Sequence, residues 1–436
     1  MRRVAVGLVV LAWAGQARAQ VAAPAPERLA VGDWTLAPVA EARVRGEYRH
    51  DLDGEDTGTL TERVRLGVDA ERGPVEVRVV LQDARLWALG DGASSIGQPA
   101  PLAATGAYEG WIGAHTSGAA PSFVRIGRQA VTWGEGRLLG ASDWSATGRS
   151  LDAARGRWVV SDWAFELLVA SLSDPGVAGV AGVGPAWGEL AGARAEWALD
   201  PLLAFELYGL ARFAQAQPVN DLEGSVEGQT YTAALRLHGD ALGWAWGAEG
   251  AGQLGRATAL VADRRAWAAA GHVAYTFDRV LLRPTVGVGG SYATGDSGGS
   301  TYGAFDPLLP DAHTWYGAMD LFAWSNEAEA SARVAVTPWT DGLAAIEYRY
   351  ARLAQPGGSW RSDNLVTIAG PSIGRDADLG HEIDASLRWR PWEPVELSAG
   401  YSALLVGAGA KEALSAFRSV PDVAHFAFGQ VSVRTP

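Results

Sequence analysis

Apolar and charged side chains alternate one by one along much of this chain. In residues 40–49, AEARVRGEYR, every even-numbered residue is Ala, Val, Gly or Tyr, and every odd-numbered residue is Glu or Arg. Successive side chains of a β-strand point to opposite faces, so this stretch has one apolar face and one charged face. A helix would spread the same charges around its circumference. The pattern predicts a strand that separates two different environments.

The alternation recurs in about eighteen segments. Short connections, such as those at 72–74 and 199–201, alternate along the chain with long ones, such as 134–154 and 294–326. Short turns on one side and long loops on the other are typical of outer-membrane β-barrels, with the turns in the periplasm. The predicted strands are 37–49, 60–72, 74–87, 106–116, 122–133, 155–161, 163–172, 188–199, 202–214, 229–239, 241–253, 264–277, 280–293, 327–337, 342–353, 380–391, 394–405 and 424–434.

A membrane environment explains both features. In hydrocarbon every backbone N–H and C=O group needs a partner within the protein, and only a closed barrel gives this to strands. We therefore predict an all-β fold, a single closed antiparallel transmembrane β-barrel of about eighteen strands, with sixteen as the alternative. Trp163, Trp339, Trp389 and Trp392 stand at or beside short turns, where an interfacial aromatic belt is expected. A soluble β-sandwich, solenoid or propeller also alternates, but favours shorter strands without this rhythm of connections.

The N-terminus has the layout of an export signal. Arg2 and Arg3 precede a short apolar run, and Ala17-Arg18-Ala19 forms a small-x-small cleavage site. The predicted organisation is a cleaved signal peptide at 1–19, a periplasmic segment at 20–36 and the barrel at 37–436, in the outer membrane of a Gram-negative bacterium.

Composition limits which partners this protein can bind and how its fold can be stabilised. The chain has no cysteine, so disulfides cannot staple it. The net charge of −13 becomes −16 without residues 1–19, because these contain three arginines and no acid. Such an acidic balance argues against a nucleic-acid partner. Lys411 is the only lysine, so arginine supplies nearly all the positive charge.

Inside a barrel, the charged faces of the strands line the lumen. Arginine suits such a wall, because its guanidinium stays charged and binds carboxylates through two parallel hydrogen bonds. Each arginine has two roles that the sequence leaves open: contact with a substrate anion, or pairing with a neighbouring acid. The arginines that the strand faces predict along the substrate path are Arg43, Arg45, Arg63, Arg65, Arg78, Arg194, Arg236, Arg333, Arg349 and Arg388. The acids predicted on the lumen wall are Glu41, Glu76, Glu196, Glu206, Glu249, Glu347, Glu382 and Asp384.

A stretch rich in Gly and Arg, GRQAVTWGEGRLLGASDWSATGRSLDAARGR at 127–157, includes a long predicted loop. A phosphate-binding loop is one alternative, but the stretch lacks a Gly-Lys-Ser/Thr ending and leads into no evident helix. We predict instead an external loop whose glycines let it bend back against the wall. Arg137, Arg149, Arg155 and Arg157 would then form a constriction that prefers anions.

This stretch, begun at Arg125, resembles the signature segment of the alginate export family of outer-membrane barrels. Two further segments carry the resemblance: YATGDSGG followed by AFDPLLPDAHTWYGAMDLFAWSN at 304–326, and DLGHEIDASLRW at 378–389 with Gly400-Tyr401. The resemblance implies a monomeric barrel of eighteen strands that lets an anionic polysaccharide leave through an arginine-rich lumen. The positions matched to the family are Arg125, Arg128, Gln129, Arg137, Asp143, Trp144, Arg149, Asp152, Asp320, Asn326, His381, Glu382 and Asp384. The resemblance thus adds Arg125 and Arg128 to the predicted substrate path, together with the loop residues Arg137 and Arg149.

The predicted function is an outer-membrane channel for passive export of an anionic, uronate-containing exopolysaccharide. A diffusion porin for uptake of small anionic solutes is the alternative, and a barrel-embedded hydrolase is a further one. Against a hydrolase, no histidine stands in a recognisable serine-nucleophile motif. His381 is interpreted as a hydrogen-bonding partner of Glu382. The expected partners are the polymer, outer-membrane lipids and periplasmic export-complex proteins. No cofactor is expected, and the acidic stretch at 51–58 is interpreted as a solvated external turn rather than a calcium site.

Overall fold

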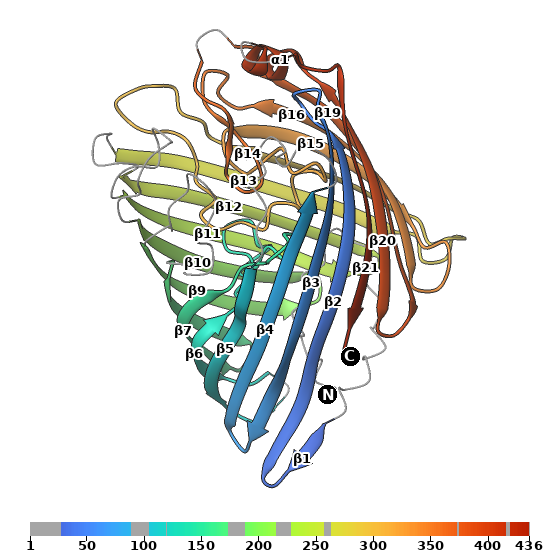
Figure 1. Ribbon diagram of the computed structural model, residues 1–436. Coiled ribbons are helices and arrows are strands. Elements are labelled where there is room, and N and C mark those ends of the chain that lie inside the picture. Colours follow the sequence, from blue (N-terminus) through green and yellow to red (C-terminus); the bar gives the residue numbers. More distant parts are fainter. Residues whose placement is uncertain are drawn as a thin grey trace.

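The computed structural model describes residues 28–88, 104–118, 120–172, 188–214, 228–256, 263–372, 375–415 and 419–435, which form one wide barrel (Figure 1). Eighteen strands build its wall. They are β2 (Trp34–His50), β3 (Asp56–Arg72), β4 (Val75–Ala88), β5 (Ala104–His115), β6 (Phe123–Gln129), β7 (Leu151–Val160), β8 (Trp163–Ser171), β9 (Gly188–Asp200), β10 (Leu203–Ala214), β11 (Gly228–Ala241), β12 (Trp244–Arg256), β13 (Asp263–Thr276), β14 (Thr285–Ala293), β15 (Glu327–Val336), β16 (Gly342–Leu353), β19 (Asp378–Trp392), β20 (Val395–Val406) and β21 (Val423–Arg434).

Each wall strand pairs antiparallel with the next, and the sheet closes on itself. β2 pairs with β3 on one side and with the last strand, β21, on the other, where Glu41 lies opposite Arg434. Between β16 and β19 the chain inserts the small hairpin β17 (Trp360–Arg361) and β18 (Thr367–Ala369). The predicted closed antiparallel barrel of eighteen strands is confirmed, and the sixteen-strand alternative is wrong.

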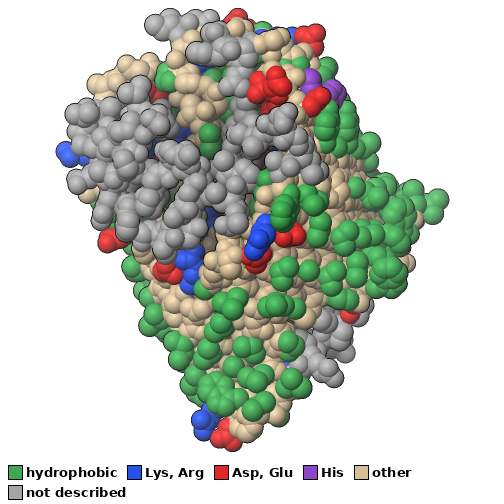
Figure 2. Space-filling model, in the orientation of Figure 1, with side chains coloured by type: hydrophobic (Ala, Val, Ile, Leu, Met, Phe, Trp, Pro, Cys, Tyr) green, Lys and Arg blue, Asp and Glu red, His purple; other side chains and the backbone are tan. Residues whose placement is uncertain are grey.

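The wall has the two faces that the alternation predicts. On β2, Val44 is 47% exposed, whereas Arg43 and Arg45 are only 4% exposed. Leu66 on β3 and Ile126 on β6 also face outward, with 59% and 61% of their surface exposed. Figure 2 shows hydrophobic side chains spread over the outer wall, with charged side chains mainly towards the ends. The apolar face therefore suits lipid, and the charged face lines the interior.

Several boundaries differ from those predicted. β1 (Leu29–Val31) pairs with the start of β2, so the wall begins at Trp34, inside the stretch expected to be a periplasmic segment. The turn after β2 is not fully solvated as predicted, because Leu52 is fully buried. A single short helix is described, α1 (Ala408–Leu414), and none of the described helices has the length and apolar character needed to cross a membrane. The predicted signal peptide, 1–19, lies outside the described residues.

Two long connections fold back into the barrel, and we call them together the plug: residues 130–150, between β6 and β7, and residues 294–326, between β14 and β15. Trp133 and Trp324, one from each connection, are fully buried. The plug packs into one hydrophobic cluster with small wall residues, among them Ala268 and Ala293. Small side chains on the wall leave room for the bulky rings, so the core of this protein lies inside the barrel.

Candidate site in the barrel interior

The two halves of the plug are joined by backbone hydrogen bonds. The amide of Gly140 donates to the carbonyl of Leu309 (2.8 Å), and the amide of Leu309 donates to the carbonyl of Leu138 (3.0 Å). A Cβ atom at Gly140 would lie 2.6 Å from the Cβ of Asp311, so only glycine allows this approach. The glycines of the stretch thus permit close packing inside the barrel, where the sequence predicts an external loop bent against the wall.

Two arginines of β2 bind backbone carbonyl groups of the plug. Arg43 donates from Nη1 to the carbonyl of Asp143 and from Nη2 to the carbonyl of Ser145, both at 2.6 Å. Arg45 donates from Nη1 to the carbonyl of Trp144 at 2.8 Å, and its guanidinium lies 3.9 Å from the centre of the Trp144 ring. These contacts fasten the plug to the wall and leave the two guanidinium groups almost fully buried.

Two arginines of β3 bind the carboxylate of the same turn. The Asp143 Oδ1 atom accepts from Arg63 Nη2 at 2.9 Å and from Arg65 Nη1 at 3.0 Å. Arg65 also donates to the carbonyl of Thr147 at 3.0 Å, and Arg63 pairs with Glu41 on the wall. We call the plug segment that runs from Asp143 to Thr147 the Asp143 turn.

The electrostatics of the Asp143 turn favour the ionised carboxylate. Burial by itself would raise the pKa of Asp143, but the positive charges of Arg63, Arg65 and Arg43 outweigh burial and lower its pKa. The carboxylate keeps 42% of its side-chain surface exposed, and Arg434 approaches its Oδ2 atom at 3.5 Å. The turn is therefore a charged contact that solutes inside the barrel can reach.

A ladder of alternating basic and acidic groups runs along the wall from β7 to β11 and enters the plug. Each of these five strands supplies one member, and the plug supplies the last two. Every acid of the ladder lies between two arginines, and only the terminal arginines, Arg155 and Arg137, have a single acid partner in it. The consecutive contacts are Arg155–Glu166 (2.6 Å), Glu166–Arg194 (3.0 Å), Arg194–Glu206 (3.3 Å), Glu206–Arg236 (2.6 Å), Arg236–Glu135 (3.4 Å) and Glu135–Arg137 (3.1 Å).

The ladder ends on a tyrosine of the second plug connection. Arg137 Nη1 donates to the hydroxyl of Tyr316 at 2.8 Å, and its guanidinium lies 4.1 Å from the centre of the Trp315 ring. Burial alone would raise the pKa of Glu135, but Arg137 and Arg236 outweigh it and lower the pKa of that carboxyl. Burial raises the pKa of Tyr316 well above its ordinary value. The ladder therefore joins the wall to both halves of the plug.

A third group of charges lies on β15, β16 and β19. Arg349 is at its centre and bonds to Glu329 and to Glu347, the latter at 2.6 Å. Arg333 approaches Glu347 at 4.0 Å. Glu382 accepts a hydrogen bond from the amide of Met319 in the plug, at 3.1 Å. On this side too, wall charges both pair with one another and hold the plug.

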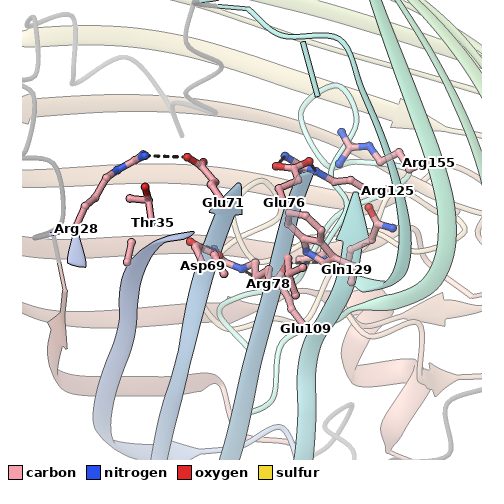
Figure 3. A pocket seen from close by; sticks show the side chains of 15 residues that line it. Arg28, Thr35, Asp69, Glu71, Glu76, Arg78, Glu109, Arg125, Gln129 and Arg155 are labelled. Carbon is pink, nitrogen blue, oxygen red and sulfur yellow. Dashed lines mark hydrogen bonds and ion pairs between the residues drawn. The ribbon is translucent and has the colours of Figure 1, made fainter. Parts of the chain in front are cut away.

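A cavity of about 360 Å³ remains inside the barrel, beside the ends of β2 to β7 that are joined by short turns (Figure 3). Arg78 and Arg125 each keep 27% of their side-chain surface exposed there, whereas Arg63 and Arg65 keep 7% or less. Both exposed arginines have acid partners: Arg78 bonds to Glu109 at 2.6 Å, and Arg125 bonds to Glu76 at 2.8 Å. These two arginines are accessible to a solute that enters the cavity.

The alternation places most of the predicted path residues on the inner face, but some lie elsewhere. Arg128 occupies the same face of β6 as the outward Val124 and Ile126, and it faces Asp152 across the pair of strands at 3.3 Å. The predicted constriction is divided, because Arg137 and Arg149 belong to the plug while Arg155 and Arg157 belong to the wall. The remaining predicted residues on the inner face are Arg43, Arg45, Arg63, Arg65, Arg78, Arg125, Arg194, Arg236, Arg333, Arg349 and Arg388, with the acids Glu41, Glu76, Glu196, Glu206, Glu249, Glu347, Glu382 and Asp384.

The interpretation of His381 as a partner of Glu382 is wrong. Neighbouring residues of a strand point to opposite faces, so His381 lies outside, where its Nδ1 atom is 2.8 Å from the Tyr348 hydroxyl. Sequence reasoning also missed Glu166, which is only 1% exposed and binds Arg155 and Arg194. Its position as the lone acid on the inner face of β8 is the signal that could have found it.

An apolar outer wall around a charged interior defines a β-barrel of the outer-membrane channel class. The chain belongs to the alginate export family, which matches residues 37–419. None of the curated proteins matches it in sequence.

Solved porin structures share the fold. OccAB2 of Acinetobacter baumannii is 11% identical, with a TM-score of 0.61 over 91% of this chain and 97% of that chain. OprD of Pseudomonas aeruginosa is 14% identical, with a TM-score of 0.59 over 91% of this chain and 94% of that chain. OccK2 (OpdF) of Pseudomonas aeruginosa, in complex with glucuronate, is 12% identical, with a TM-score of 0.58 over 92% of this chain and 98% of that chain. At these identities the likeness concerns the fold alone.

Proposed function

We propose that this protein is a passive outer-membrane channel through which an anionic, uronate-containing exopolysaccharide is exported. The observation that carries the proposal is the cavity at the periplasmic ends of the strands, where Arg78 and Arg125 keep accessible guanidinium surface. Membership of the alginate export family supports it. A carboxylate of the polymer would bind these groups through charge-assisted hydrogen bonds and then pass on, without a catalytic step by the protein.

Uptake of small anionic solutes is the second candidate. The OccK2 structure, which shares the fold, contains glucuronate, a single uronate unit. A porin needs to recognise one such unit, whereas an exporter gains from several contacts along a polymer. The two candidates therefore differ in how binding depends on the length of the ligand.

The test is current block in planar bilayers by uronate oligomers of increasing length. For export, the concentration that halves the current falls as the oligomer lengthens. Arg78→Gln and Arg125→Gln each raise that concentration about tenfold, as expected when one hydrogen bond to a charged group is lost. Arg283→Gln, in an exposed turn where Arg283 pairs with Asp278, is the matched control and leaves the block unchanged.

Equal block by monomer and by long oligomers would favour the porin. No block by any uronate would contradict both candidates. We expect the channel to act as a monomer, and cross-linking in membranes that yields a defined oligomer would overturn this part of the proposal.

A further inference from the structure

The Asp143 turn presents oxygen atoms to four arginines, as an acidic sugar does. Its acceptors are one carboxylate and a series of carbonyl groups, bound by Arg43, Arg45, Arg63 and Arg65. A uronate unit likewise has one carboxylate surrounded by neutral oxygen atoms. The guanidinium fork binds either set of acceptors with the same geometry.

The balance of charge at the turn favours exchange for an anion. Among the described residues, Arg43 forms no ion pair, and its hydrogen bonds go to carbonyl groups of Asp143, Ser145 and Ala146. A buried guanidinium with neutral partners only is less well compensated than one that binds a carboxylate. A carboxylate brought by the polymer would therefore be a better partner for Arg43 than the turn is.

The turn is also bounded by positions suited to movement. Ser142 and Gly148, on its two sides, have left-handed φ angles of 48° and 70°. Changes of φ and ψ at a few loop residues allow a segment to move as a unit. The half-exposed Arg434 touches Asp143 from the end of β21, at the periplasmic side, so an entering polymer reaches this contact directly.

We propose that the Asp143 turn is an internal mimic of the substrate: it occupies the arginines until a carboxylate of the polymer displaces it. This inference rests on the proposed function and adds a mechanism of opening. The mimic acts by competition, because turn and polymer need the same guanidinium groups. Its effective concentration is high, since it is tethered beside its site.

The test compares one substitution in the turn with one among the arginines that hold it. Asp143 binds Arg63 and Arg65 through its carboxylate, and Arg43 binds the backbone carbonyl of Asp143. Asp143→Asn weakens the mimic and leaves the arginines, so the uronate concentration that halves the current falls about tenfold, the ratio equivalent to about 1.4 kcal/mol. Arg43→Gln removes part of the site itself, so this concentration rises. Asp152→Asn, an acid on the outer face, is the matched control and leaves it unchanged.

The outcomes separate the two proposals. If uronate blocks the unmodified protein, and Asp143→Asn and Arg43→Gln shift the uronate concentration that halves the current equally, the mimic is overturned and the export proposal stays intact. Block of none of the variants overturns the export proposal and the mimic with it. Folding of each variant is checked by the mobility of unheated samples in gels, and an unfolded Asp143→Asn is replaced by Asp143→Ser, for which the same shift is expected.

Discussion

Glu166 offers the strongest test of the interior charge ladder. This carboxylate bonds to Arg155 at 2.6 Å and to Arg194 at 3.0 Å, and it accepts from the Trp133 indole at 2.7 Å. Glu166→Gln keeps the size of the side chain and removes its charge. Because the group is 1% exposed, water cannot replace the lost partner of the arginines.

Removing one partner of a buried ion pair costs about 3–5 kcal/mol, and we expect a loss of this size for Glu166→Gln. The assay is urea unfolding of the protein in lipid vesicles, followed by tryptophan fluorescence. Glu396→Gln is the control, because Glu396 and Arg390 form an exposed pair that contributes about 0–1 kcal/mol. Equal stability of the two variants would refute the view that the ladder fixes the plug.

Three further outcomes follow from the contacts. Gly192→Ala should cost about 1–3 kcal/mol in unfolding free energy, since the new Cβ would lie 2.7 Å from the Trp133 ring; the control Gly252→Ala meets nothing within 4 Å. Leu66→Arg, on the outer wall, should cost about 2–4 kcal/mol and lower the folding yield in vesicles; a normal yield would contradict a lipid-facing position. The pKa of Asp143 is lowered in the folded protein, so its contacts stabilise the fold at pH values above the ordinary Asp pKa. This stabilisation is lost as the pH falls through the lowered pKa. Conductance should then rise in acid, and Asp143→Asn should abolish the rise.

The wall could be predicted from the sequence because its rule is local. Each strand has to present one face to lipid and one to water, so the period of two is visible in stretches such as 40–49. The same rule places Arg128 outside, since it shares its parity with Val124 and Ile126. The family resemblance assigns that residue to the path instead, and the alternation is the better guide at this position.

The plug could not be predicted in the same way. Residues 130–150 and 294–326 have no regular period, and their burial depends on contacts between connections distant in sequence. The partner of each arginine also depends on register between strands, as with Arg194 and Glu206. The sequence could name the charges on the inner face, but which charge meets which is set by the closed sheet.

The central claim is that arginines make the channel prefer anions to cations. The most direct test of this claim is a measurement of the ion selectivity of the channel. Reversal potentials are measured across a planar bilayer with a gradient of potassium chloride. We predict a preference for chloride, which weakens as salt rises because screening shortens to about 8 Å at physiological ionic strength. A preference for potassium would contradict the claim.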